Sequence, residues 1–90
     1  MSVSKSIEII NKLGMHARAA AQFVQVASSF TSHIEIEKDE RRVNGKSIMG
    51  VMMLAASKGS MVVLYVNGED EVESMDKLEA LINNRFNEDE

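Results

Sequence analysis

Two periodicities in the hydrophobic pattern divide the chain into strands and helices. Segments in which apolar and polar residues alternate predict half-buried strands, and an unbroken apolar run between turn signals is typical of a central strand. The clearest alternation is Ile-Glu-Ile-Glu at residues 34–37, and the unbroken run begins at Met61. A hairpin tip at residues 39–40 separates the second strand from the third. The predicted strands are residues 3–10, 34–37, 41–44 and 61–66.

Apolar residues spaced three and four apart predict a long helix near each end of the chain, with a short helix between them. Ser47 stands directly before the apolar run of the short helix, as an N-cap does, while Gly50 weakens that helix. The predicted helices are residues 17–29, 48–55 and 71–86. The stripe of the last helix consists of Val72, Met75, Leu78, Leu81, Ile82 and Phe86. We expect residues 87–90 to form a frayed acidic tail.

The order of these elements, βαββαβα, predicts the fold class. Four short strands with helices that cover one face are typical of an α+β open-faced β-sandwich, here a four-stranded antiparallel sheet with three helices on one face. A chain of 90 residues has the size of one domain, so we expect residues 1–90 to form a single domain. Its core is modest, because a chain this short buries only about 60–65% of its unfolded surface.

Composition and charge argue against several classes of function. The formal net charge is −4, whereas binding to nucleic acid needs a basic surface. The chain has no cysteine, and its two histidines have no ligand-like spacing, so we expect no disulfide, no thiol chemistry and no metal site. No apolar run approaches the length of about 20 residues that a membrane span needs, and no leader pattern opens the chain. We therefore expect a cytoplasmic location.

The strongest candidate for chemistry is His16, in the segment Leu-Gly-Met-His-Ala-Arg-Ala-Ala at residues 13–20. A glycine turn brings it to the start of the first helix, where free backbone N–H groups and a partial positive charge favour a bound anion. Imidazole is a nucleophile that carries a phosphoryl group covalently, and the N–H groups of Ala17 and Arg18 are placed to hold the phosphoryl oxygens. The alternative from local spacing alone is a poor N-cap followed by a solvated arginine.

Two motifs stand out in this order of elements. One is Leu-Gly-Met-His-Ala-Arg at residues 13–18, and the other is Lys-Ser-Ile-Met-Gly-Val-Met at residues 46–52. The first resembles the phosphohistidine motif, and the second the regulatory serine motif, of the HPr family, the histidine-containing phosphocarriers of the bacterial phosphotransferase system. The resemblance covers essentially the whole chain. It implies a phosphocarrier that is a substrate of other enzymes, without a cofactor and without turnover of its own.

The resemblance also assigns roles to individual residues. It implies that His16 accepts the phosphoryl group on Nδ1, as a pros-phosphohistidine, and that Arg18 steadies the phosphoryl oxygens. It implies that Ser47 is the target of an ATP-dependent kinase, a role compatible with capping the short helix. A phosphate there adds a charge of about −1.5 to −2 near the surface around His16. His33, in contrast, lies at a strand start and is expected to be a solvated surface residue.

The implied partners are the first enzyme of the phosphotransferase system, the receiving domains of sugar permeases or regulators, and the HPr serine kinase/phosphorylase. A short helix cannot bury all its sides, so we expect an exposed, methionine-rich surface around His16 that contacts these partners. Such interfaces are small and transient, and we expect a monomer. The expected contact residues are Ala17, Ala21, Ile48, Met49, Met52 and Met53.

One position departs from the family pattern. The family motif usually continues His-Ala-Arg-Pro-Ala, whereas this chain has Ala19, which restores a backbone donor in the first helical turn.

Three alternatives stay open for the function. The first is the nitrogen-regulatory branch of the system, which residues 10–16 and the acidic tail resemble, while residues 46–54 resemble the sugar branch. A purely regulatory adaptor of the same fold is a second alternative. A small nucleic-acid-binding split βαβ domain is the third, although Tyr65 is the only aromatic residue on a predicted strand.

Overall fold

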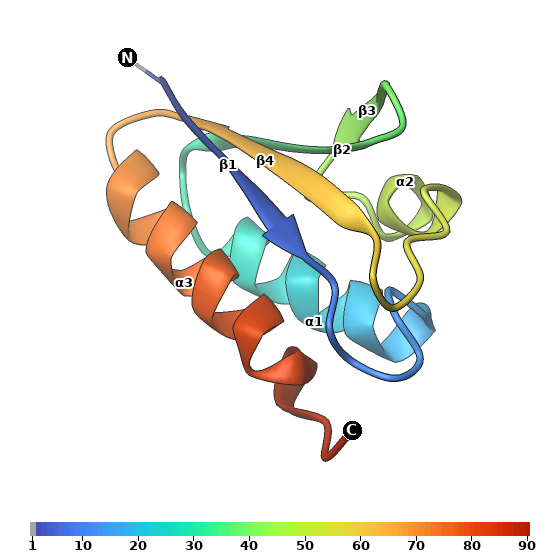
Figure 1. The fold of residues 1–90 in the computed structure, drawn as a ribbon. Helices are drawn as coiled ribbons and strands as arrows, with labels where there is room; N and C mark the ends of the chain where they lie inside the picture. Colours follow the sequence, from blue (N-terminus) through green and yellow to red (C-terminus); the bar gives the residue numbers. More distant parts are fainter. Residues whose placement is uncertain (1) are drawn as a thin grey trace.

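Four strands form one antiparallel sheet in a computed structural model, which describes residues 2–90 (Figure 1). The strand order is β1-β4-β2-β3, so β4 and β2 are the central strands. The strands are β1 (Ser2–Glu8), β2 (His33–Lys38), β3 (Arg41–Asn44) and β4 (Met61–Asn67). The helices are α1 (Ala17–Ser28), α2 (Ile48–Met53) and α3 (Glu71–Asn83), followed by the single turn η1 (Arg85–Asn87).

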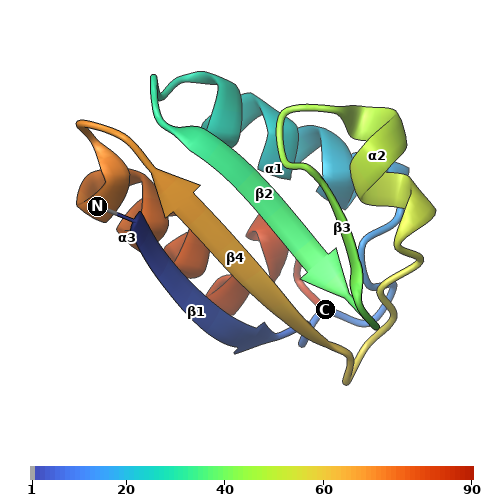
Figure 2. The same cartoon turned by 90° about the horizontal axis from the view of Figure 1, so that it is seen from above.

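The helices cover one face of the sheet and leave the other face open (Figure 2). The two long helices, α1 and α3, run side by side beneath the sheet, and α2 lies next to β3 and the first part of α1. This arrangement is the predicted α+β open-faced sandwich. It brings the start of α1, the whole of α2 and the end of α3 to the same end of the molecule (Figure 1).

The core lies between the sheet and the long helices, and the predicted strand alternation supplies the sheet's share of it. On β4, Val62, Leu64 and Val66 are fully buried, while the residues between them are only partly covered. Ile7 of β1 pairs in register with Val62 and is also buried. Burying one large apolar side chain contributes about 1.5–3 kcal/mol. The helices contribute Ala19, Ala20, Phe23 and Ala27 from α1, and Met75, Leu78, Leu81 and Ile82 from α3.

The helix α3 differs from the prediction in two ways. The last helix ends at Asn83 rather than at Phe86, and Val72, predicted in its buried stripe, is 63% exposed. Residues Arg85, Phe86 and Asn87 have φ angles of +56°, +54° and +65°, in the left-handed region that reverses the chain. Burial of the Phe86 ring, which is only 2% exposed, offsets the cost of these angles. The prediction extended this helix to Phe86 because the apolar spacing continues that far. In the structure Phe86 is buried by the turn η1 and not by the helix.

Candidate functional site

A tight turn between β1 and α1 places His16 at the helix start. The N–H of Gly14 donates to the carbonyl oxygen of Asn11 at 3.1 Å and closes the turn. Gly14 has a φ angle of +64°, and a Cβ atom here would lie 2.5 Å from the carbonyl oxygen of Ala56, so the position requires glycine. The N–H of Met15 donates to the same Ala56 oxygen at 2.8 Å. The chain before His16 is thereby fixed against the loop that follows α2.

His16 is the N-cap residue of α1. Its backbone is extended, with φ −71° and ψ 179°, and its carbonyl oxygen accepts a hydrogen bond from the N–H of Ala20 at 2.8 Å. The N–H groups of Ala17, Arg18 and Ala19 precede that bond and are the free donors of the helix start. The His16 side chain makes no capping hydrogen bond, and the first turn of α1 carries no acidic residue. The partial positive charge of the helix start therefore lies beside the imidazole, where it favours an anion.

A carboxylate from the far end of the chain contacts the imidazole. His16 Nε2 and Glu88 Oε2 lie 2.5 Å apart. The other oxygen, Glu88 Oε1, accepts a hydrogen bond from Asn11 Nδ2 at 3.0 Å, and the same amide donates to the Gly14 carbonyl oxygen at 2.8 Å. The side chain of Asn11 is fully buried. Glu88 thus joins the imidazole to the turn that precedes α1.

The prediction of a frayed tail at residues 87–90 is wrong, because the tail docks against the start of α1. The backbone N–H of Lys12 donates to the carbonyl oxygen of Glu90 at 2.7 Å, and the Glu88 side chain is only 15% exposed. The acidic composition of these residues suggested a solvated end. Phe86 argues against a solvated end, because a large apolar side chain directly before an acidic end anchors that end to a core.

The pKa of the Glu88 carboxyl group lies below its ordinary value. Burial raises this pKa, but hydrogen bonds from Asn11 and His16, together with electrostatic attraction to His16 and Arg18, outweigh the effect of burial. The group is therefore ionised at neutral pH and acts only as a hydrogen-bond acceptor.

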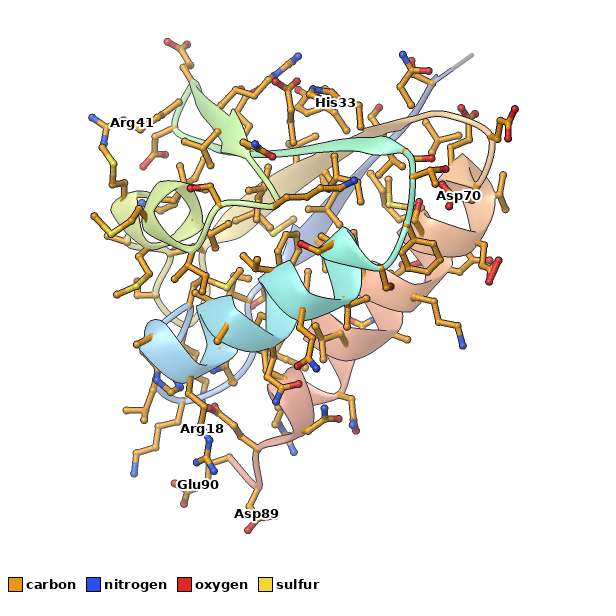
Figure 3. The ribbon with its side chains drawn as sticks, turned by 180° about the vertical axis from the view of Figure 1, so that it is seen from behind. Arg18, His33, Arg41, Asp70, Asp89 and Glu90 are labelled. Carbon is orange, nitrogen blue, oxygen red and sulfur yellow. The ribbon has the colours of Figure 1, made fainter. Side chains whose placement is uncertain are left out.

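The start of α1 and the tail enclose an open hollow with a volume of about 560 Å³. Arg18 points from α1 toward Asp89 and Glu90 at this hollow, whereas His33 lies at the opposite end of the molecule (Figure 3). The structure therefore brings His16 and Arg18 together and keeps His33 away, as a solvated residue on β2. The hollow is lined by Lys12, Leu13, His16, Arg18, Gln22, Phe86, Asn87, Glu88, Asp89 and Glu90.

The short helix α2 has the N-cap predicted for it but ends at Met53 rather than at Ala55. The Ser47 hydroxyl oxygen accepts a hydrogen bond from the N–H of Gly50 at 3.0 Å, so the N-cap prediction is confirmed. α2 packs against α1, and the buried Val51 faces the core. Leu13 is also exposed, at 66%, and was not predicted as part of the apolar surface. The predicted contact residues Ala17, Ala21, Ile48, Met49, Met52 and Met53 are all exposed.

Two further observations describe residues 2–90 as a whole. In this part of the chain, no three histidine, aspartate or glutamate side chains are grouped to hold a metal ion. None of the helices described is long and apolar enough to cross a membrane.

Replacement of Asn11 by alanine is expected to lower the free energy of unfolding by about 1–3 kcal/mol, because it leaves the Gly14 carbonyl oxygen and the Glu88 carboxylate without their donor. Urea unfolding measures the change. Asn67→Ala, at an exposed strand end, is the matched control and should leave the transition midpoint nearly unchanged. Equal midpoints for the two variants would contradict the structural role of Asn11.

Comparisons with known proteins agree with this fold. A family model described as the phosphorylation site of the HPr component of the phosphotransferase system matches residues 3–84. The phosphocarrier protein HPr of Neisseria meningitidis serogroup A is 56% identical over 88 residues, which cover 98% of this chain and 99% of that protein. The phosphocarrier protein HPr of Cupriavidus necator is 53% identical over 88 residues, with the same two coverages of 98% and 99%.

A solved structure shares the architecture over nearly the whole length. The crystal structure of HPr-C-His from Thermoanaerobacter tengcongensis matches with a TM-score of 0.94 and 50% sequence identity, covering 98% of this chain and 99% of that one. The family match spans the turn at His16 as well as the cap at Ser47. The chain belongs to the HPr family.

Proposed function

We propose that residues 1–90 act as one phosphocarrier domain of the phosphotransferase system, in which His16 accepts a phosphoryl group on Nδ1 and passes it on. The observation that carries the proposal is the place of His16 as N-cap of α1, beside N–H groups that the helix does not use. Membership of a family whose curated relatives are phosphocarriers supports it. The donor is the first enzyme of the system, and the acceptors are receiving domains of sugar permeases or regulators.

The transfer step uses the imidazole of His16, the backbone N–H groups at the start of α1 and the side chain of Arg18. The lone pair of Nδ1 attacks phosphorus while the bond from phosphorus to the donor's histidine breaks, and the electron pair of that bond returns to the donor. The N–H groups of Ala17 and Arg18 and the Arg18 guanidinium meet the charge on the phosphoryl oxygens. One arginine and a few N–H groups hold the phosphoryl group loosely, so it leaves again to the next acceptor.

Incubation with phosphoenolpyruvate and the first enzyme, followed by intact-mass measurement, tests this function. We expect one added phosphoryl group per chain, lost in acid and stable in base, as in a phosphoramidate. An unchanged mass, under conditions that phosphorylate the first enzyme itself, would favour a regulatory adaptor or a nucleic-acid-binding domain. Neither alternative requires His16 to accept a phosphoryl group.

We propose that partners dock on the apolar surface formed by α1 and α2 next to the hollow. Its methionine side chains are flexible and fit partners of different shape. Small, transient contacts of this kind suit a monomer that works in the cytoplasm and meets several partners in turn. The surface consists of Ala17, Ala21, Ile48, Met49, Met52 and Met53, all of them exposed.

A second candidate function is regulation at Ser47 by a serine kinase/phosphorylase. The hydroxyl caps α2 and stands directly before Ile48 and Met49, which are exposed. A phosphate on this oxygen brings a charge of about −2 to the apolar docking surface, where a partner would have to desolvate it without a compensating group. The modification would therefore block docking and leave the fold intact.

Replacement of Ser47 by aspartate is expected to raise the KM of the first enzyme for this protein by about tenfold, which corresponds to about 1.4 kcal/mol. Thermal stability should stay equal or rise slightly, because aspartate also caps a helix and an anion is favourable at a helix start. Steady-state kinetics and a melting curve measure the two effects.

Two further variants separate docking from charge alone. Ser4→Asp adds the same charge on the exposed side of β1 and should leave KM unchanged, whereas Met49→Glu should raise it without any change at the serine. An equal KM for Ser47→Asp and the unmodified protein would remove the regulatory role and leave Ser47 as a helix cap.

A further inference from the structure

Glu88 is held at the site by two hydrogen bonds that use both of its carboxylate oxygens. Oε2 lies 2.5 Å from His16 Nε2, and Oε1 lies 3.0 Å from Asn11 Nδ2. The side chains of His16 and Glu88 are 28% and 15% exposed, so the contact is partly shielded from water. Shielding makes such a pair stronger than an ion pair on the open surface. The contact therefore restrains the orientation of the imidazole.

The same contact decides which ring nitrogen carries the proton. An ionised carboxylate only accepts hydrogen bonds, so the bond to His16 needs a proton on Nε2. In a neutral imidazole with its proton on Nε2, the free lone pair is on Nδ1. That lone pair is not used to cap α1, because the His16 side chain makes no capping hydrogen bond. Nδ1 is thus the nitrogen that is available as a nucleophile.

We propose that Glu88 is a positioning residue for His16, whose carboxylate keeps the imidazole proton on Nε2 and so makes Nδ1 the phosphoryl acceptor. The inference rests on the proposed function, because it names what sets the reactivity of the same histidine. No sequence motif indicates it, since Glu88 comes from the tail and reaches the site only through the reversal at η1.

The positive charge that develops on the imidazole during transfer supports a second part of the role of Glu88. Attack by Nδ1 on phosphorus, with the proton retained on Nε2, leaves the ring with substituents on both nitrogens and a positive charge. The carboxylate that accepts the Nε2 hydrogen bond stabilises this charge as it develops, as an oriented carboxylate does for an imidazolium in acyl transfer. Transfer in the reverse direction passes through the same charge distribution. Glu88 should therefore act on the rate of transfer more than on docking.

The experiment compares the unmodified protein with Glu88→Gln and with Glu73→Gln. Glu73 is exposed on α3 and does not line the hollow, so the second variant is the matched control, with the same change of side chain and the same loss of charge. Nitrogen-15 NMR of the imidazole reports the tautomer. We expect the proton on Nε2 in the unmodified protein and in Glu73→Gln, and a mixture of the two tautomers in Glu88→Gln.

Single-turnover transfer from the phosphorylated first enzyme gives the second readout. We expect about a tenfold slower transfer in Glu88→Gln with little change in KM, partial recovery in Glu88→Asp, and no change in Glu73→Gln. An unchanged tautomer in Glu88→Gln, or an altered tautomer with an unchanged rate, would overturn the role of Glu88. Failure of the proposed function is distinct, because then the unmodified protein would not be labelled on His16 at all.

Discussion

Replacement of His16 by alanine is expected to abolish phosphoryl transfer from the first enzyme to this protein. In the proposed function the imidazole is the nucleophile at the start of α1, and alanine offers no lone pair in its place. The measurement is the intact mass after incubation with phosphoenolpyruvate and the first enzyme, with a phosphorylated fraction that falls to background.

The fold should survive this substitution. The hydrogen bonds that shape the site before α1 come from the backbone of Gly14 and Met15, and the first helical bond uses the carbonyl oxygen of residue 16 rather than its side chain. Loss of the imidazole leaves Glu88 free to meet water, so the change in the free energy of unfolding should stay within about 1 kcal/mol. A melting curve and the amide NMR spectrum check this expectation.

His33→Ala is the matched control. His33 is the only other histidine in the chain, and it lies on β2 at the opposite end of the molecule from Arg18 (Figure 3). Labelling should stay complete in His33→Ala and vanish in His16→Ala. Full labelling of His16→Ala would show that another residue is the acceptor and would reject the proposed site.

Much of the fold is predictable because its determinants are local. The alternation at residues 34–37 and the apolar run from Met61 each reflect one buried face of a strand, and the structure has β2 and β4 there. Asp39 and Glu40, predicted as a hairpin tip, have the positive φ angles of a tight two-residue turn. The end of α3 is less predictable, since the apolar stripe does not distinguish a residue buried by a helix from Phe86, which is buried by a reversal.

The candidate site divides in the same way. His16, Arg18 and Ser47 stand out in the sequence because a helix start is a local structure with its own residue preferences. The partner of the imidazole does not stand out. Glu88 is separated from His16 by 72 positions, and their contact depends on the docking of α3, the burial of Phe86 and the amide of Asn11. A contact that depends on these three distant features of the fold leaves no pattern in a single sequence.

Replacement of Arg18 by alanine is expected to slow phosphoryl transfer by about 30-fold or more, with a much smaller effect on KM. Loss of one preorganised donor to a transferring group costs about 2–4 kcal/mol in the barrier, and the exposure of Arg18 argues for the lower part of that range. In the resting protein Arg18 points toward the acidic tail at the hollow (Figure 3). In the proposed function its charge is needed chiefly while the phosphoryl group is between donor and acceptor, so we expect the effect on the rate of transfer.

Two variants make the Arg18 experiment specific. Lys12→Ala removes another cation that lines the same hollow and pairs with Glu90, so it tests whether positive charge in general supports transfer. Arg18→Lys keeps the charge but loses the planar pair of donors that fits phosphoryl oxygens, and should recover only part of the rate. Rapid-mixing measurement of single-turnover transfer, at several concentrations of this protein, separates the rate from KM. One missing donor is expected to slow transfer by more than about twofold. A transfer rate for Arg18→Ala within about twofold of the rate for the unmodified protein would therefore make Arg18 a surface charge without a role in transfer.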